Sequence, residues 1–272
     1  MNYFLDFCLL FSALVLLLIS INWNVLKFLK LTLIINNKGN RYYLIPGLSE
    51  PLPSVTSILS TISKPGLINW EKNVAIDYAK DKISKYISNT ENTNLDGLHE
   101  IFENAKEQPK FIMSKAGEFG SKAHKFIELL LEQDFNVDVP NNMKWIYKNF
   151  NDWKNEYNFN SIEQEKYLYS AKYGYAGTAD SIGLVDENLF ILDWKTSKSL
   201  YIENLLQVSA YANAYSELTG NQISNAGVLR LDKNKTGYEF KIIDDLEKHF
   251  ITFRAVLWLW RFLNDPNSSY SK

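Results

Sequence analysis

The chain has 272 residues, of which 46% are hydrophobic and 22% charged, and this size and composition predict one sizeable globular domain. Its formal net charge of −2 excludes a protein that binds nucleic acid through overall positive charge, although a local basic groove would be enough to follow a phosphate backbone. Cys8 is the single cysteine in the sequence. Disulfides within the chain and a four-cysteine iron–sulfur cluster are therefore excluded.

An apolar leader opens the chain. Residues 7–26 carry no charged side chain, and about 20 apolar residues are enough for a helix to span a bilayer. No basic residue precedes them and no small-residue cleavage site follows, which argues against a cleaved signal peptide. We predict that residues 1–36 are either a membrane anchor or the product of a start assigned too far upstream, with a buried helix as the third alternative. Lysines after the segment would leave the rest of an anchored chain cytoplasmic or facing the nucleoid.

The first half of the expected domain, which we place at residues 37–265, is mostly helical. Leu67, Trp70 and Val74 recur at helical spacing, Pro65-Gly66 is a break before them, and Ser54 is a good N-cap. The expected elements are a strand at 41–45 and helices at 54–62, 67–87, 98–107, 111–133 and 143–157. Residues 266–272 are expected to form a disordered tail.

The second half alternates strands and helices. Asp186-Glu187-Asn188 is a turn between two apolar strands, and Gly220 is a typical C-terminal cap of a helix. The expected elements are strands at 163–170, 175–185, 189–194, 225–231 and 238–243, and helices at 201–218 and 245–262. This order predicts the α/β class, with a central mixed β-sheet flanked by helices and an N-terminal helical portion as one wall.

Two carboxylates and an ammonium lie on the predicted hairpin at 175–194 and just beyond it. Alternate side chains of a strand share a face, so Asp193 and Lys195 should project to the same side, and Asp180 would face them from the other strand. Such a group suits a divalent cation together with a side chain that helps to activate water. The alternative is a solvated surface pair, but the apolar surroundings favour charges that are compensated by a partner or a metal.

Two helices carry further polar candidates. Gly120, His124 and Glu128 are spaced by four residues and share one helical face. Gln207 and Tyr211 are one turn apart on the helix after the hairpin. The alternatives are an ordinary helix-surface acid for Glu128, and a satisfied polar pair at a helix–sheet seam for Gln207 and Tyr211.

These residues resemble the motifs of a known superfamily. The sequence GTAD at 177–180 followed by DWK at 193–195 resembles the PD-(D/E)XK nuclease superfamily, with Ala179 at the position of the nominal proline. GEFGSKAHKFIE at 117–128 and QVSAY at 207–211 resemble the histidine helix and the Q-x-x-x-Y motif of RecB-type exonucleases. LPSVTSIL at 52–59 and KPGLINW at 64–70 are similar to the mitochondrial genome maintenance exonuclease family. The resemblance spans residues 42–262.

The resemblance implies a restriction-endonuclease-like core and a site for Mg²⁺ or Mn²⁺. Asp180 and Asp193 would be its carboxylate ligands, and the backbone carbonyl of Trp194 and the imidazole of His124 would complete the protein's share. Glu128 would be a partner that orients His124.

The resemblance also implies the activity. Lys195 would orient or help to deprotonate water, or stabilise developing charge, and Gln207 and Tyr211 would hold water, a phosphate oxygen or a base. The expected protein is a monomeric exonuclease that acts on single-stranded DNA ends in DNA repair, replication or recombination and leaves 5′-phosphate and 3′-hydroxyl ends. The alternatives are a catalytically silent nucleic-acid-binding module on the same fold, a restriction-type endonuclease, and a membrane protein whose soluble part is a scaffold.

Overall fold

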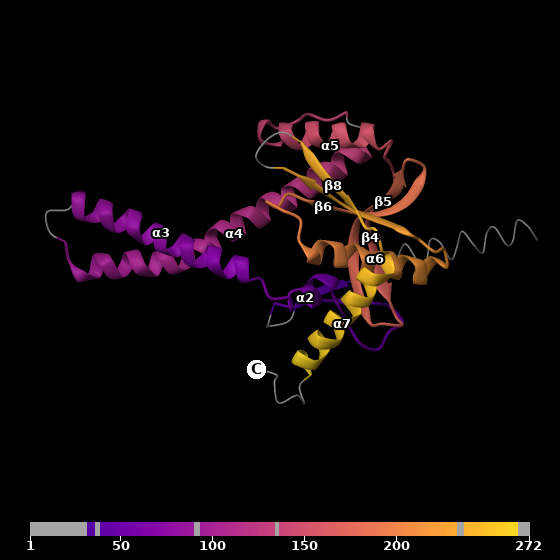
Figure 1. Cartoon of the computed structure of the whole chain (residues 1–272), viewed down its shortest axis with the longest axis horizontal. Coiled ribbons are helices and arrows are strands. Elements are labelled where there is room, and N and C mark those ends of the chain that lie inside the picture. Colours follow the sequence, from indigo (N-terminus) through magenta and orange to yellow (C-terminus); the bar gives the residue numbers. More distant parts are fainter. Residues whose placement is uncertain (1–31, 36–38, 90–92, 134–135, 233–236, 266–272) are drawn as a thin grey trace, which may run out of the picture.

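A five-stranded sheet covered by helices forms the body of the molecule, and two long helices project from it (Figure 1). This computed structural model describes residues 32–35, 39–89, 93–133, 136–232 and 237–265. The predicted α/β class with a mixed sheet flanked by helices is confirmed. The predicted membrane span at residues 7–26 and the predicted tail at 266–272 lie outside the described residues. In the part that is described, none of the helices has the length and apolarity that crossing a membrane requires.

The sheet has the strand order β4-β5-β6-β7-β8. Its strands are β4 (Asn160–Ser170), β5 (Tyr175–Val185), β6 (Asn188–Lys195), β7 (Asn225–Leu231) and β8 (Tyr238–Ile242). Only the β6–β7 pair is parallel, because the helix α6 (Ile202–Thr219) carries the chain back between these strands. The predicted hairpin is confirmed with a shorter turn. Asp186 and Glu187 both adopt a positive φ, as a two-residue hairpin turn requires, so Asn188 already belongs to β6.

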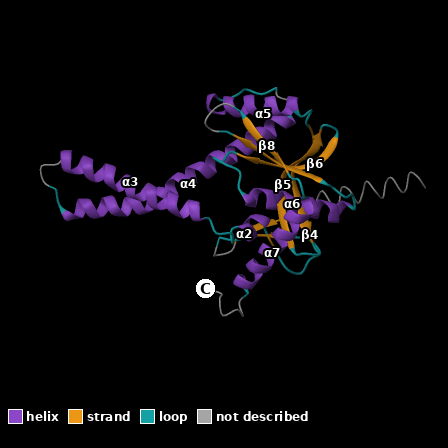
Figure 2. Ribbon diagram, viewed as in Figure 1, coloured by secondary structure: helices purple, strands orange, loops and turns teal. Residues whose placement is uncertain are grey.

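Helices cover both faces of the sheet (Figure 2). One face packs on α2 (Val55–Leu59), α6 and α7 (Leu246–Asn264) through residues such as Ile191, Val208 and Phe253. The other face packs on the C-terminal part of α4 (Leu95–Glu132) and on α5 (Lys144–Glu156), which follows a 3-10 turn at Asn141–Met143. Burial of apolar side chains on both faces explains why β5 and β6 are almost continuously hydrophobic.

An aromatic cluster fills the α5 face. Trp153 is fully buried, and its ring centroid lies 5.5 Å from that of Trp194, 4.9 Å from that of Phe159 and 5.2 Å from that of Phe240. Most of these pairs meet edge to face, which aromatic rings favour. Because Trp194 lies between Asp193 and Lys195, this cluster fixes the part of β6 that carries the candidate site.

A small sheet stands beside the large one. Its strands β1 (Thr32–Ile35), β2 (Arg41–Leu44) and β3 (Leu52–Pro53) are antiparallel. The last residues of the predicted leader, up to Ile35, thus form a strand that pairs with the predicted domain. Ser54 caps α2 as predicted, since its Oγ accepts a hydrogen bond from the backbone N–H of Ser57. The helix ends at Leu59 rather than at Ile62.

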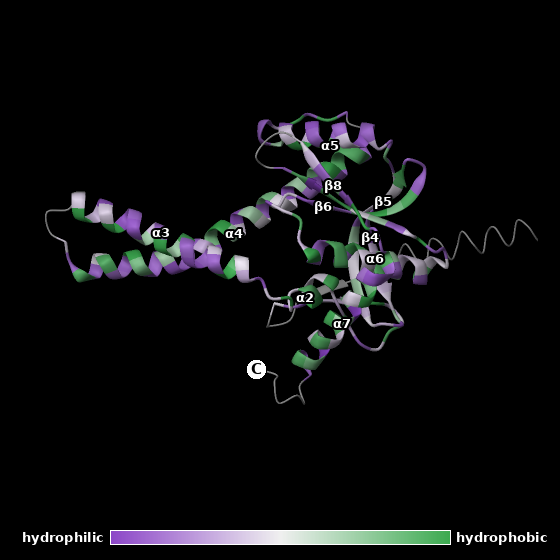
Figure 3. Cartoon of the chain, viewed as in Figure 1, coloured by the Kyte–Doolittle hydropathy of each residue, from purple (hydrophilic) through white to green (hydrophobic). Residues whose placement is uncertain are grey.

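The projecting arm consists of α3 (Pro65–Asn89) and the N-terminal part of α4 (Figure 1). The predicted break at Pro65-Gly66 is instead the first turn of α3, where a proline loses no helical hydrogen bond. The prediction of two helices at 98–107 and 111–133 was wrong, because α4 runs without a break through Pro109. Figure 3 shows hydrophobic and hydrophilic residues interleaved along both helices of the arm.

Candidate active site

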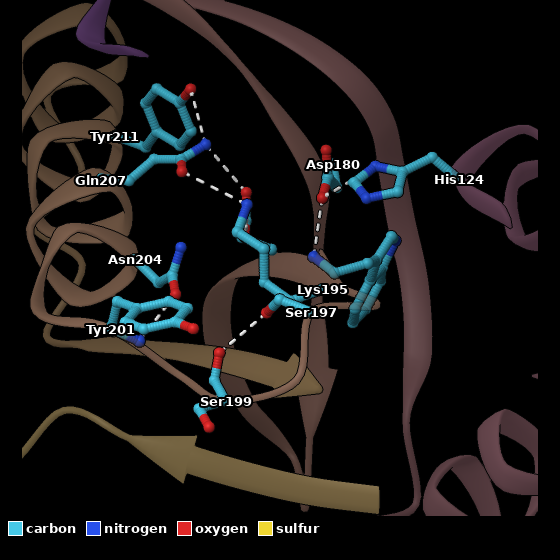
Figure 4. Close-up of polar contacts among 11 residues, drawn as sticks. His124, Asp180, Lys195, Ser197, Ser199, Tyr201, Asn204, Gln207 and Tyr211 are labelled. Atoms are coloured by element: carbon cyan, nitrogen blue, oxygen red, sulfur yellow. Dashed lines mark hydrogen bonds and ion pairs between the residues drawn. The ribbon is translucent and has the colours of Figure 1, made fainter. Parts of the chain in front are cut away.

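Asp180 and His124 meet between the sheet and α4 (Figure 4). The Nδ1 atom of His124 lies 3.3 Å from Oδ2 of Asp180, and the side chains are 28% and 11% exposed. Oδ2 of Asp180 also accepts a hydrogen bond of 2.6 Å from the backbone N–H of Trp194. The hairpin therefore fixes the carboxylate from one side and the helix supplies the imidazole from the other. This brings the histidine helix to the predicted site, as the sequence suggested.

Asp193 and Lys195 form an ion pair with each other, as the period of a strand predicts. Asp193 is only 1% exposed. Gln207 joins the two residues, because its Nε2 donates to Oδ1 of Asp193 at 2.9 Å while its Oε1 accepts from Nζ of Lys195 at 3.3 Å. Tyr211 completes the network, with its hydroxyl accepting from Nε2 of Gln207 at 3.2 Å. Gln207 and Tyr211 thus lie at a helix–sheet seam, where Gln207 contacts both Asp193 and Lys195 and Tyr211 contacts Gln207.

Gly177 lets Tyr211 reach this position. A Cβ atom at Gly177 would lie 2.4 Å from Cε1 of Tyr211, closer than two non-bonded carbon atoms can approach. The Tyr211 side chain is buried, so its ring has little room to move away. The glycine of the GTAD sequence is therefore required by close packing against the helix that carries Gln207.

We expect Gly177→Ala to lower the free energy of unfolding by about 1–3 kcal/mol, because overpacking a filled core forces side chains off their preferred rotamers. Equilibrium unfolding in urea measures this change. Gly117→Ala is the matched control, since nothing lies within 4 Å of a Cβ there, and alanine in a helix interior should stabilise by roughly 0.5–1 kcal/mol. Equal stabilities for the two variants would contradict the packing described for Gly177.

Glu128 does not take the predicted place beside His124. Its carboxylate accepts from Nζ of Lys125 at 2.7 Å, and within the described residues no hydrogen bond or ion pair joins it to the imidazole. The expected ligand role of the Trp194 carbonyl stays a prediction, since only the N–H of Trp194 is engaged at the site.

Glu165 is the site residue that sequence reasoning missed. One ligand atom each from His124, Glu165 and Asp180 lie within 4.8 Å of one another. Strand β4 brings Glu165 there, because the register pairs Gln164 with Ser181 and Lys166 with Ala179, which sets Glu165 level with Asp180. The expected strand at 163–170 and the hairpin after it were enough to predict that Glu165 lies beside Asp180. A short connection at 171–174 places residue 165 opposite residue 180.

The charges of the site shift its pKa values in a consistent pattern. Burial alone would raise the pKa of Asp180, but the neighbouring His124 and Lys195 outweigh it and lower that pKa. Burial opposes the charged forms of His124 and Lys195, yet the carboxylates beside them raise both pKa values. Lys195 is therefore a stable ammonium at neutral pH.

The other two carboxyl groups hold protons more tightly than usual. Burial, followed by repulsion from Asp180, raises the pKa of Asp193. Burial of the carboxyl group and the charge of Asp180 raise the pKa of Glu165 to about 7. Burial is the larger cause of both shifts, and the negative charge of Asp180 adds to it.

This set of groups fits a divalent cation. Three carboxylates and one ammonium leave the site with two net negative charges when the imidazole is neutral. An imidazole nitrogen with carboxylate oxygens is a donor set that Mn²⁺ accepts readily, and the carboxylates suit Mg²⁺. Asp180 and His124 are the residues placed to hold the ion, with Asp193 on the adjacent strand and Glu165 on the other side.

Comparisons with known proteins add little to this description. No family model matches the chain. No curated protein matches it either. Among solved structures the chain is similar to one described as "Crystal structure of SSO0001", at a TM-score of 0.33 and 14% identity, over 71% of this chain and 88% of that chain. A TM-score this low carries no argument about fold or function.

Proposed function

We propose that the protein is a metal-dependent deoxyribonuclease that hydrolyses DNA phosphodiester bonds and acts as an exonuclease on single-stranded ends. The supporting observation is that His124 pairs with Asp180, that Asp193 pairs with Lys195, and that the N–H of Trp194, which lies between Asp193 and Lys195 in β6, donates to Asp180. The order of strands and helices is compatible with a restriction-endonuclease-like core, which the resemblance of the sequence implies. DNA repair, replication and recombination are processes that use such an activity.

The proposed chemistry assigns a task to each side chain. A divalent cation, when bound, lowers the pKa of water and offsets charge on the phosphate. Asp180 and His124 hold the ion, with Asp193 as the second carboxylate. Lys195 donates hydrogen bonds to water or to a phosphate oxygen. Its raised pKa favours this role over that of a general base, because a base at neutral pH would need a lowered pKa.

Gln207 and Tyr211 position the ammonium rather than react themselves. The Gln207 amide contacts both Asp193 and Lys195, so it fixes the distance between the acid and the amine. Tyr211 is paired with Gln207 and buried. This burial supports a positioning role for Tyr211 over the expected stacking on a base.

Affinity for the cation should depend on pH, because protons compete with the metal for the same atoms. The pKa of Glu165 is about 7, so this carboxyl group loses its proton between pH 6 and pH 8, and the raised pKa of His124 keeps the imidazole protonated to a higher pH than usual. We expect the affinity for Mn²⁺ to rise by about ten-fold or more over this range, measured by isothermal titration calorimetry. His124→Ala should show a shallower rise. An affinity that is constant with pH would contradict the assignment of these ligands.

The activity is tested with two single-stranded DNA substrates, an end-labelled linear strand and a circular strand, each in Mg²⁺, Mn²⁺ or EDTA. We expect loss of the linear strand in either metal, no reaction in EDTA, and an intact circle. Asp180→Asn should be inactive. Asp186→Asn, an exposed position in the turn of the same hairpin, should keep full activity, since asparagine tolerates a positive φ.

The other outcomes identify the alternatives. Cutting of the circle as fast as of the linear strand would favour the restriction-type endonuclease. Binding of DNA without cleavage in any metal would favour the silent binding module. Cleavage that continues unchanged in EDTA would remove the metal mechanism altogether.

A further inference from the structure

Glu165 differs from the neighbouring acids in its interactions. Glu163 forms an ion pair with Lys166, and Glu128 forms one with Lys125. The Glu165 side chain makes no hydrogen bond or ion pair within the described part of the chain. Its carboxylate instead lies with the imidazole of His124 and the carboxylate of Asp180, with one ligand atom of each inside 4.8 Å.

The backbone holds Glu165 in a conformation that its residue type disfavours. Its φ is +46° in the interior of a strand whose neighbours on both sides are paired with β5. The left-handed region costs a non-glycine residue roughly 1–2 kcal/mol, and asparagine or glycine would adopt it more readily. The sheet therefore holds a glutamate next to Asp180 in a backbone conformation that glutamate disfavours.

Two negative groups side by side repel each other unless a cation lies between them. The imidazole cannot neutralise both carboxylates, and Lys195 is already engaged by Asp193 and Gln207. Lys125 also acts on the Glu165 carboxylate, but it is already paired with Glu128. The carboxylate of Glu165 is exposed and lies with the donor atoms of His124 and Asp180.

We propose that Glu165 is a direct ligand of the divalent cation held by His124 and Asp180, so that the protein contributes a third carboxylate from strand β4. This inference rests on the proposed metal-dependent activity, and it deepens the description of the same site. A ligand on β4 would tie the first strand of the sheet to the hairpin and the histidine helix. The cation would then cross-link helix α4 with the consecutive strands β4 and β5.

The test measures binding of Mn²⁺ alone to the full chain, from the electron paramagnetic resonance signal of the free ion at pH 8. We expect Glu165→Gln to weaken binding by about 10- to 100-fold, a loss typical of groups that support a metal site. Glu165→Asn is a second variant that suits the positive φ and lacks the carboxylate, and it should show the same loss. Circular dichroism without metal confirms that each variant is folded.

The controls are Glu163→Gln and Glu128→Gln, which remove nearby acids that are paired with lysines. Both should bind Mn²⁺ within about three-fold of the unaltered protein, as surface substitutions usually do little. Wild-type affinity in the two folded Glu165 variants would overturn the proposal, even if the protein degrades DNA. A chain that binds Mn²⁺ through Glu165 but cleaves no DNA would instead overturn the proposed function and leave this ligand in place.

Discussion

Replacing Lys195 by methionine is expected to lower the rate of hydrolysis of linear single-stranded DNA by about 10²- to 10³-fold, because the charge that stabilises the transition state is lost. Methionine keeps the length of the side chain and removes the ammonium. Single-turnover cleavage of end-labelled DNA in Mg²⁺ measures the change. The control is Lys198→Met, an exposed position on the loop after β6, which should keep the full rate.

The same substitution should also destabilise the protein, because Asp193 is then a buried carboxylate without its partner. Breaking a buried ion pair by removal of one member costs about 3–5 kcal/mol. Burial already raises the pKa of Asp193, so the carboxyl takes up a proton in acid, and the loss should be smaller at pH 5 than at pH 8.

The double variant Lys195→Met/Asp193→Asn separates the two effects. It removes both charges, so we expect it to regain most of the stability in urea unfolding while it stays inactive. Activity close to that of the unaltered protein in either variant would show that Lys195 has no part in the reaction. A double variant no more stable than the single one would show that Asp193 is not the origin of the loss.

Trp153→Ala should be the most destabilising single substitution on the α5 face, lowering the free energy of unfolding by about 3–5 kcal/mol. Its indole is fully buried and contacts the rings of Phe150, Phe159, Trp194 and Phe240. Removing it leaves a cavity among large rings that cannot collapse to fill it. Urea unfolding at 25 °C, with intrinsic fluorescence as the signal, measures the loss.

Trp258→Ala is the matched control for this experiment, since its side chain is 67% exposed on α7. A change within about 0.5 kcal/mol is expected there. A loss of less than about 1 kcal/mol in Trp153→Ala would contradict the packing of the cluster. Because Trp194 donates its N–H to Asp180, we also expect the Trp153 variant to have weaker metal binding at temperatures where it is still folded.

The elements that sequence analysis predicted well are those with a local physical signal. The apolar hairpin, the Ser54 cap and the Gly220 cap depend on residues a few positions apart. The continuous helix through Pro109 was missed because a proline is usually a helix boundary. In α4 its side chain is buried, so tertiary packing compensates for the lost hydrogen bond.

The sequence predicted those residues of the candidate site that lie in the recognised motifs. His124, Asp180 and Gln207 were found from spacing and resemblance; His124 lies against Asp180, and Gln207 lies against Asp193 and Lys195. Glu165 was not found, because nothing in the residue type marks a glutamate that will adopt a positive φ. Glu128 was expected at the site from helical periodicity and from the resemblance, but neither predicts that its carboxylate pairs with Lys125.

The uninterrupted helix α4 connects the outer part of the arm with the candidate site. Leu95, near the tip of the arm, is about 43 Å from His124 along the axis of a straight helix. Pro109 lies between them, and the missing hydrogen bond there is the point of least resistance to bending. A body that pulls on the outer end of the arm would flex the helix at this joint before it displaces the imidazole.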